Sequence, residues 1–163
     1  MSQYPALGFH FRAEFLDTSG KRAFDEISFQ EISGLNVEIG VEELSEGGVN
    51  NYSHRLPGKV KYGNLVLKRG MPLAMEGTKL KSPLQADASG LVDWAIKSIE
   101  QYEFKPMNVD VYLLNEKNDP MMAWHFYRVW PVKLVTTDLK AQDNAIVIES
   151  FELAYQRFTR RKG

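Results

Sequence analysis

The eight residues LNVEIGVE, at positions 35–42, carry the most regular alternation in the chain. Every odd position is apolar, and every even position is polar or glycine. Because side chains of a β-strand point alternately to its two faces, this period of two predicts a strand with one buried and one wet face. We expect the apolar face to lie in the protein core, with Val37 and Ile39 at its centre. The wet face carries Asn36, Glu38 and Glu42.

Other segments on both sides of this strand are rich in aromatic and β-branched residues and also alternate. The sequences DTSGKR, at 17–22, and EKND, at 116–119, have the composition of hairpin loops. The pattern predicts further strands over 9–16, 24–32, 50–56, 62–70, 107–115, 120–130 and 145–158.

One segment, residues 89–102, has the spacing of an amphipathic helix. Leu91, Trp94, Ala95 and Ile99 recur on one helical face, and Ser89 stands where an N-cap is expected. We expect this face to cover the sheet. The aromatic residues expected in the core are Phe9, Phe11, Trp94, Trp124 and Phe126.

Length and composition indicate one soluble globular domain spanning residues 1–163. The chain has 163 residues, 20 basic and 21 acidic, and no cysteine. It therefore lacks the net positive charge of a nucleic-acid-binding protein, and disulfides and thiolate metal sites are excluded. With one helix among many strands, we predict a mainly β fold, an antiparallel sandwich or barrel, with a long loop over 70–90.

Signals for chemistry are few. His10, His54 and His125 lie far apart, without the spacing of a metal site, and the phosphate-binding glycine motifs are missing. We therefore expect no metal and no cofactor. Glu38 and Glu42 could perform acid–base chemistry, but alternating glutamates more often form a solvated strand face. The basic residues of 59–69 resemble a nucleic-acid patch without a companion, so no sequence-specific nucleic-acid binding is expected.

A family resemblance is carried by RLPGKVKYGNLVLKRG, at 55–70, which follows a glycine-glycine turn at Gly47 and Gly48. This run resembles the signature segment of tail-tube proteins of contractile phage tails and bacterial contractile injection systems. The resemblance extends over the opening strand, the helix at 91–99 and the closing strands, and so covers nearly the whole chain.

The resemblance implies a structural subunit without enzymatic turnover. Six copies would form a ring, and rings would stack into a tube whose lumen is a continuous β-barrel that conducts a payload. The implied partners are further tube rings, a sheath and baseplate or spike proteins, without membrane insertion. Assembly in the bacterial cytoplasm and release in a phage tail or injection particle would follow. In such a barrel Asn36, Glu38 and Glu42 would face the lumen.

Residues 46–62 are then expected to form an arm between subunits, because glycines give it reach and Pro57 stiffens its return. Its cations would meet acidic surfaces of a neighbouring subunit or ring. The contact residues expected are Glu46, Gly47, Gly48, Asn50, Asn51, Tyr52, Arg55, Pro57, Gly58, Lys59 and Lys61.

Three alternatives stay open at this point. A free secreted ring, similar to the haemolysin-coregulated protein of type VI secretion, would hold cargo instead of forming a conduit, and an enzyme would use the Glu38 and Glu42 face. Residues 70–90 are longer than the connection usual in the family. A ring that initiates the tube next to the baseplate is therefore an alternative to the main tube subunit.

Overall fold

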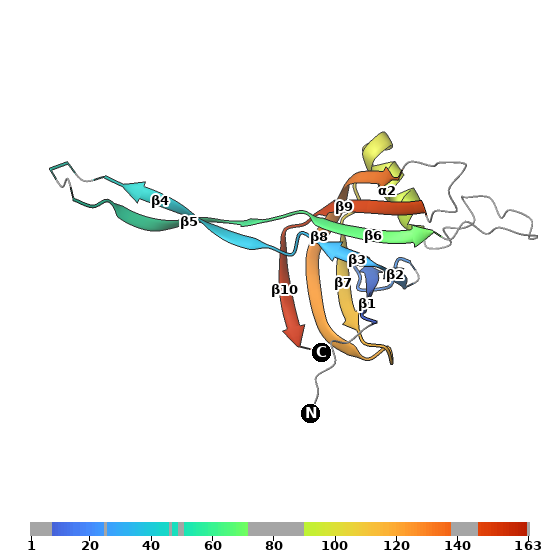
Figure 1. The fold of residues 1–163 in the computed structure, drawn as a ribbon. Helices are drawn as coiled ribbons and strands as arrows, with labels where there is room; N and C mark the ends of the chain where they lie inside the picture. The colour runs from blue at the N-terminus through green and yellow to red at the C-terminus, as the bar shows by residue number, and fades with distance from the viewer. Residues whose placement is uncertain are drawn as a thin grey trace, which may run out of the picture.

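The computed structural model describes residues 8–24, 26–45, 47–48, 51–71, 90–137 and 147–162, and its fold is mainly β. These residues form the strands and the helix α2 drawn in Figure 1. The elements are β1 (His10–Leu16), β2 (Ile27–Phe29), β3 (Glu31–Ser33), β4 (Val37–Leu44), β5 (His54–Tyr62), β6 (Leu65–Met71), α2 (Leu91–Gln101), β7 (Met107–Leu114), β8 (Pro120–Thr136), β9 (Val147–Ala154) and β10 (Arg157–Lys162).

The main sheet is antiparallel throughout and folds into two layers. Its strand order is β2-β1-β7-β8-β9-β6-β3, and β10 adds to β8. The first part of β8 pairs with β7 and β10, whereas its last part pairs with β9. Strands β6 and β9 run across the direction of β7, β8 and β10 (Figure 1). The predicted class, an antiparallel sandwich or barrel with a helix, is therefore confirmed.

A bulge at Arg128 makes the corner between the layers. Arg128 has a φ of 52°, and its N–H donates a hydrogen bond of 3.1 Å to the side-chain oxygen of Asn108. The register between β7 and β8 shifts at this point. Because a bulge adds a residue to one strand and bends it, β8 can leave β7 and continue beside β9.

The core lies between the layers and is closed on one side by α2. Phe15, Phe29, Phe126 and Phe151 are fully buried, and Leu91, Trp94 and Ala95 of the helix join them. The Trp94 ring meets Phe15 edge-on at 5.8 Å, and its Nε1 donates a hydrogen bond of 2.9 Å to the Lys105 carbonyl. The indole therefore combines apolar burial with a satisfied polar group.

The structure corrects three of the predicted core residues. Trp94 and Phe126 are buried, and Phe11 and Trp124 are partly buried against the core. Phe9, Val37 and Ile39 are exposed by 46%, 53% and 54%, so their assignment to the subunit core is wrong. The physical reason in the case of Val37 and Ile39 is that β4 lies on no layer of the sandwich.

Several predicted boundaries also change. The expected strand over 24–32 divides into β2 and β3, and the one over 145–158 divides into β9 and β10. Helix α2 begins after Gly90, which is its N-cap and makes no side-chain cap, in place of the expected Ser89. Ser89 and most of the predicted 70–90 loop lie outside the described residues.

Strands β4 and β5 pair only with each other and form a hairpin that projects from the sandwich (Figure 1). We call residues 37–62 the arm. It begins earlier in the chain than the predicted segment 46–62, because β4 belongs to it.

The two chain segments at the root of the arm touch so closely that each needs a glycine. Gly34 has a φ of 83°, and a Cβ there would stand 1.8 Å from the Asn64 carbonyl oxygen. A Cβ on Gly63 would stand 2.0 Å from the side-chain oxygen of Asn36. The direction in which the arm leaves the sandwich therefore depends on this crossing.

Replacing Gly34 with alanine is expected to destabilise the subunit by more than the roughly 1–2 kcal/mol that a left-handed residue with a Cβ costs. The additional cost comes from the overlap with a backbone carbonyl, which cannot rotate away. Gly20→Ala is a matched control, because Gly20 has the same φ of 83° and nothing within 4 Å of the added carbon. Urea unfolding of both variants measures the difference, and equal losses would contradict the close-crossing account.

Candidate assembly surfaces

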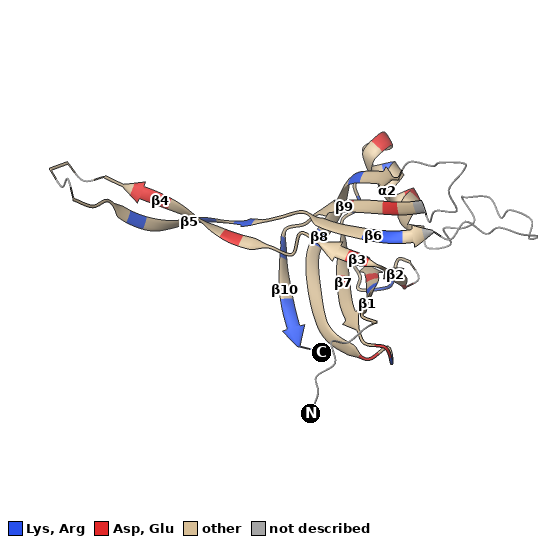
Figure 2. Ribbon diagram, in the orientation of Figure 1, with Lys and Arg blue, Asp and Glu red and all other residues tan. Residues whose placement is uncertain are grey.

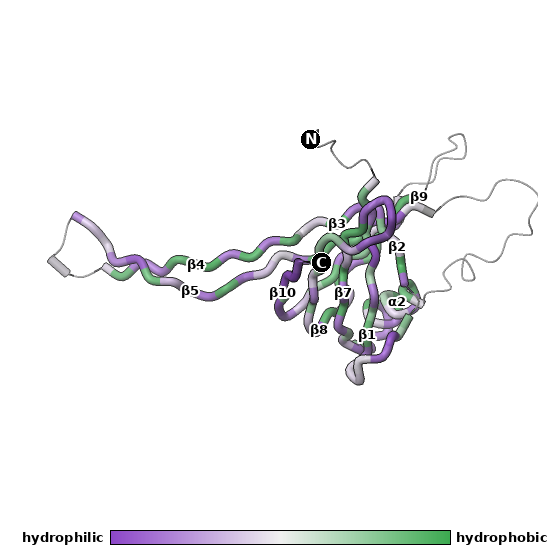
Figure 3. The backbone as a smooth tube through the Cα atoms, turned by 90° about the horizontal axis from the view of Figure 1, so that it is seen from below, coloured by the Kyte–Doolittle hydropathy of each residue, from purple (hydrophilic) through white to green (hydrophobic). Residues whose placement is uncertain are grey.

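The arm carries an apolar ladder along one side. Three cross-strand pairs form it: Val37 with Tyr62, Ile39 with Val60, and Val41 with Pro57. Directly opposite residues of an antiparallel pair share a face, so these six side chains lie together. We call them the apolar ladder. Figure 3 shows hydrophobic and hydrophilic residues alternating along both strands of the arm.

The ladder is exposed for most of its length. Val37, Ile39, Val41 and Val60 are each exposed by 52–54%. Only the root of the ladder touches the sandwich, where the Tyr62 ring meets Tyr155 at 5.8 Å and Phe158 at 5.5 Å. A contiguous apolar surface of this kind marks an interaction site, because single exposed apolar residues are common but rows of them are not.

Charged residues of the arm pair across the hairpin on both of its sides. Glu38 lies directly opposite Lys61 on the side away from the ladder, and Glu43 lies directly opposite Arg55 on the ladder side, beyond Val41. Lys61 and Arg55 therefore each have a carboxylate as their cross-strand neighbour. Figure 2 shows the acidic positions on β4 and the basic positions on β5, side by side along the hairpin. No strongly one-signed field arises from these strands.

The remaining predicted arm residues have different local roles. A register shift between Ile39 and Val41 places Gly58 and Lys59 beside Gly40. A Cβ on Gly58 would stand 3.1 Å from the Gly40 carbonyl oxygen, so the strands approach closely there. The other described residues of the set, Gly47, Gly48, Asn51 and Tyr52, are exposed. Glu46 and Asn50 lie outside the described residues.

The predicted lumen-facing residues divide between the arm and its root. Glu38 and Glu42 are exposed on β4. The side-chain oxygen of Asn36 lies against Gly63 at the root, and the Gly63 N–H donates to the Asn36 carbonyl at 3.3 Å. Because both glutamates stand on an exposed two-stranded hairpin, they lack the enclosure that acid–base catalysis usually requires.

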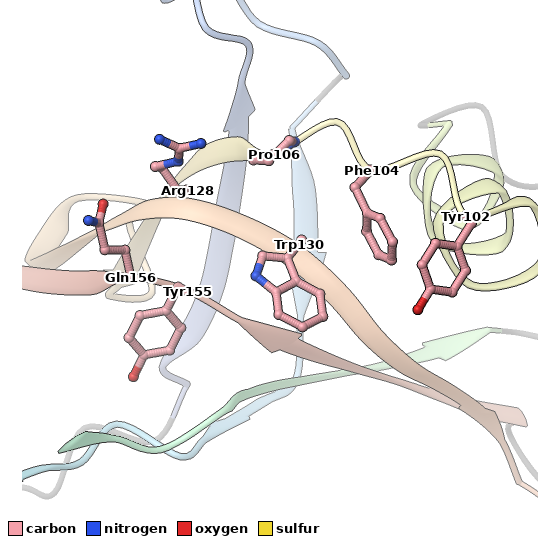
Figure 4. A pocket seen from close by; sticks show the side chains of 7 residues that line it. All are labelled: Tyr102, Phe104, Pro106, Arg128, Trp130, Tyr155 and Gln156. Carbon is pink, nitrogen blue, oxygen red and sulfur yellow. The ribbon is translucent and has the colours of Figure 1, made fainter.

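A second surface, which the sequence did not reveal, is an aromatic pocket of about 590 Å³. Figure 4 shows its side chains and the elements that carry them. Its walls come from the segment after α2, from the bulge of β8 and from the end of β9. The lining residues are Tyr102, Phe104, Pro106, Arg128, Trp130, Tyr155 and Gln156.

Three aromatic rings form the exposed part of this pocket. The ring of Phe104 lies 5.1 Å from Tyr102 and 5.8 Å from Trp130, both edge-on. Tyr102 is exposed by 82%, Phe104 by 42% and Trp130 by 40%. Large aromatic surfaces that remain this open are typical of protein interfaces.

Tyr155 joins the pocket to the core. Its ring lies 4.9 Å from Phe126, and its hydroxyl forms no hydrogen bond within the part of the chain that the structure describes. Burial, with a smaller contribution from Tyr62, raises the pKa of Tyr155 to about 12. The hydroxyl is therefore held neutral over the whole physiological range.

Charged pairs stabilise the outer faces of the sandwich. Arg69 binds Glu149 at 2.9 Å between β6 and β9, and both side chains are largely buried. His125 contacts Asp110 between β8 and β7. These pairs link neighbouring strands. Among the described residues no group of three potential metal ligands occurs, and no helix is long and apolar enough to cross a membrane.

Residues 7–159 match the family described as T4-like virus tail tube protein gp19. No curated protein matches the chain. Among solved structures, a chain of the anti-feeding prophage baseplate is 30% identical with a TM-score of 0.72, and the match covers 99% of this chain and 98% of that one.

Two further structures share the fold. A chain of the sheath–tube complex of an extracellular contractile injection system, PVC, is 22% identical with a TM-score of 0.69, over 99% of this chain and 94% of that one. Hcp1 from Salmonella typhimurium is 11% identical with a TM-score of 0.55, over 96% and 87%.

Tyr155→Phe is expected to change the alkaline stability of the subunit. The folded chain keeps the Tyr155 proton up to a pH of about 12, whereas an unfolded tyrosine loses it near pH 10. Stability therefore falls as the pH rises through this interval, because the unfolded chain is the form that releases the proton.

The phenylalanine variant should lose this part of the decline. At pH 7 it should be as stable as the parent or slightly more stable, because an unpaired hydroxyl is removed. Unfolding free energies at pH 7, 10 and 11 measure the effect, with exposed Tyr52→Phe as the control. Parallel pH curves for the parent and Tyr155→Phe would show that Tyr155 does not titrate in this way.

Proposed function

The chain belongs to the T4-like virus tail tube protein gp19 family, and we propose that six copies form a ring that stacks with others into the inner tube of a contractile apparatus. The resemblance read from the sequence is thereby confirmed at the level of the family. The observation that carries the ring is the exposed apolar ladder of the arm. Its described contacts with the rest of its own chain are confined to the root.

An isolated two-stranded hairpin is only marginally stable in water, and three or more strands or a packing surface are needed to hold it. The arm has two strands and an exposed apolar side. Contact with a neighbouring subunit would supply the missing surface. Because the contact joins different parts of two identical chains, repeated copies close into a ring or continue as a filament.

The side of β4 opposite the ladder suits a water-filled lumen. Glu38 and Glu42 stand on that side, while Asn36 belongs to the root. With the ladder buried on a neighbour, the carboxylates remain in water, where like charges are screened over about 8–10 Å. The exposed Asn51 and Tyr52 near the far end of the arm are placed to contact an adjacent subunit or ring.

Partners beyond the tube follow from the related assemblies. The relatives come from a baseplate and from a sheath–tube complex. A sheath outside the tube, a baseplate or spike at its end and a payload inside are therefore the partners proposed for this chain. The role is structural and needs no catalytic group. Assembly in the cytoplasm before incorporation into a tail or particle fits this role.

Electron microscopy of the purified protein tests the proposal. Stacked six-membered rings are expected, and a protein that stays monomeric at high concentration would contradict it. The alternative is a free secreted ring that carries cargo, and the observation that supports it is the structural likeness to Hcp1. Isolated rings that do not stack under tube-forming conditions would favour that alternative.

Val37→Ser with Ile39→Ser is expected to abolish ring formation while leaving the subunit folded. Both side chains are more than half exposed in one subunit, so its stability should change by only about 0.5 kcal/mol. Size-exclusion chromatography and thermal unfolding separate assembly from folding. The matched control exchanges the side chains, Val37→Ile with Ile39→Val, and should still assemble. Normal rings from the serine variant would exclude the ladder as the ring contact.

Lys61→Glu is expected to weaken tube formation by placing a carboxylate opposite Glu38, since like charges opposite each other destabilise a strand pair by a few tenths to about 1 kcal/mol. Adding Glu38→Lys restores the pair and should restore tubes, as measured by light scattering and microscopy. If the double variant stays defective and salt alters the defect, Lys61 binds a neighbouring subunit through its charge.

A further inference from the structure

The aromatic pocket lies at the corner of the sandwich from which the arm projects, but the ladder of the arm cannot cover the pocket of its own chain. Tyr62, at the root of the ladder, touches Tyr155, which lines the pocket. Beyond that contact the arm extends away from the sandwich, on the side opposite α2 (Figure 1). The exposed part of the ladder therefore lies out of reach of its own pocket.

Backbone strain is concentrated at the pocket. Among the described residues, the non-glycine positions with positive φ are Tyr102, Asn118 and Arg128. Asparagine tolerates this conformation in turns, whereas in tyrosine and arginine it costs conformational free energy. Tyr102 and Arg128 both line the pocket. Strained residues that persist in a fold are most often found where a binding or catalytic surface is built.

The left-handed backbone of Tyr102 caps α2, with its N–H donating to the Lys97 carbonyl, but this use does not require a tyrosine side chain. Tyr102 ends α2 with a φ of 59°, a position that glycine normally takes. Its side chain is exposed by 82%, so it contributes little to the core. A glycine would end the helix more cheaply. The chain instead places a large aromatic ring at the open side of the pocket, beside Phe104.

We propose that this pocket is the receptor for the apolar ladder of a second copy of the chain. The inference rests on the proposed ring, and names the surface on which the arm docks. Rings of Tyr102, Phe104 and Trp130 offer flat apolar faces, and the ladder offers β-branched side chains and Pro57 to cover them. Both surfaces lose exposed apolar area in the contact, which is the dominant favourable term in association.

Charge supports the same pairing. Arg128 stands exposed at the rim of the pocket. Along β4 the alternation that begins with Val37, Ile39 and Val41 continues to Glu43, on the same side of the arm. A carboxylate at the end of the ladder, opposite Arg55 of β5, therefore accompanies the apolar residues into the contact, where it can also pair with the Arg128 guanidinium.

The geometry of this contact is head-to-tail. Each subunit would donate its arm to one neighbour and receive an arm from another, because ladder and pocket are different surfaces. The contact also explains why two surfaces of modest size suffice. Each subunit in a closed ring makes the contact twice, so breaking one leaves the other to hold the subunit in place.

Cross-linking tests the pairing directly, and the absence of cysteine makes it clean. A chain that carries both Ile39→Cys and Phe104→Cys should, after treatment with a short bis-maleimide, give a series of covalent oligomers up to the size of the closed ring. A mixture of the two single-cysteine chains should give only dimers. The control pair is Ile39→Cys with Met121→Cys, since Met121 is exposed by 48% at the start of β8 and does not line the pocket. This pair should give no covalent oligomers.

The outcomes separate this inference from the proposed function. Rings seen by microscopy without covalent oligomers from the Ile39–Phe104 pair would contradict the pocket as receptor, while the proposed role as a tube subunit would stand. Cross-links confined to single chains would overturn the receptor as well, because the pocket would then hold a segment of its own chain. A chain that forms neither rings nor covalent oligomers would contradict both the proposed tube function and the pocket as receptor.

Tyr102→Gly supplies a second readout that a purely structural tyrosine would not produce. In the Val37→Ser/Ile39→Ser background, which keeps subunits apart, removal of the left-handed strain should raise the melting temperature by about 2–4 °C. In the parent background the same substitution should reduce ring formation at least tenfold, and Tyr102→Phe should retain it. A variant that is stabilised and assembles normally would show that the ring of Tyr102 takes no part in docking.

Discussion

The constraint on which this molecule depends is that the described part of the chain leaves the apolar side of a two-stranded hairpin uncovered. Strands β4 and β5 have no third strand, and their apolar ladder stays in water except at its root. Within one subunit this arrangement costs stability, because apolar surface remains hydrated and the hairpin lacks support. In the proposed ring the same arrangement would connect identical subunits, and the sandwich would hold that connector in a fixed direction.

The fixed direction comes from the crossing at the root. Gly34 allows two chain segments to approach more closely than any residue with a Cβ would permit, and the Asn36 side chain lies against Gly63. On the sandwich side, the rings of Tyr62, Tyr155 and Phe158 pack edge-on around the base of the ladder. A close backbone contact and an aromatic cluster thus fix the arm at one end. The rest of the arm needs a partner.

Charge plays a secondary part in this account. Lys61 and Arg55 of the arm face carboxylates across the hairpin, and the exposed pair Lys68–Glu31 joins neighbouring strands of the sandwich. Exposed pairs of this kind contribute little stability each, but they keep polar strand faces compatible with water. The surfaces that remain without partners in the subunit are apolar and aromatic. For this reason we attribute the proposed association to burial of those surfaces.

The sequence by itself determined the class of fold, the positions of most strands and the helix, the family and the two-sided character of β4. Each of these depends on local patterns: a period of two, a helical spacing, or a continuous run such as RLPGKVKYGNLVLKRG. Only the tertiary structure decided which apolar face is core. Val37 and Ile39 alternate as core residues do, yet β4 pairs with β5 alone. The alternation of apolar and polar residues does not specify which strands pair. The aromatic pocket was invisible for the same reason. Tyr102, Arg128 and Tyr155 come from three separate segments, and the bulge of β8 and the end of α2 bring them together.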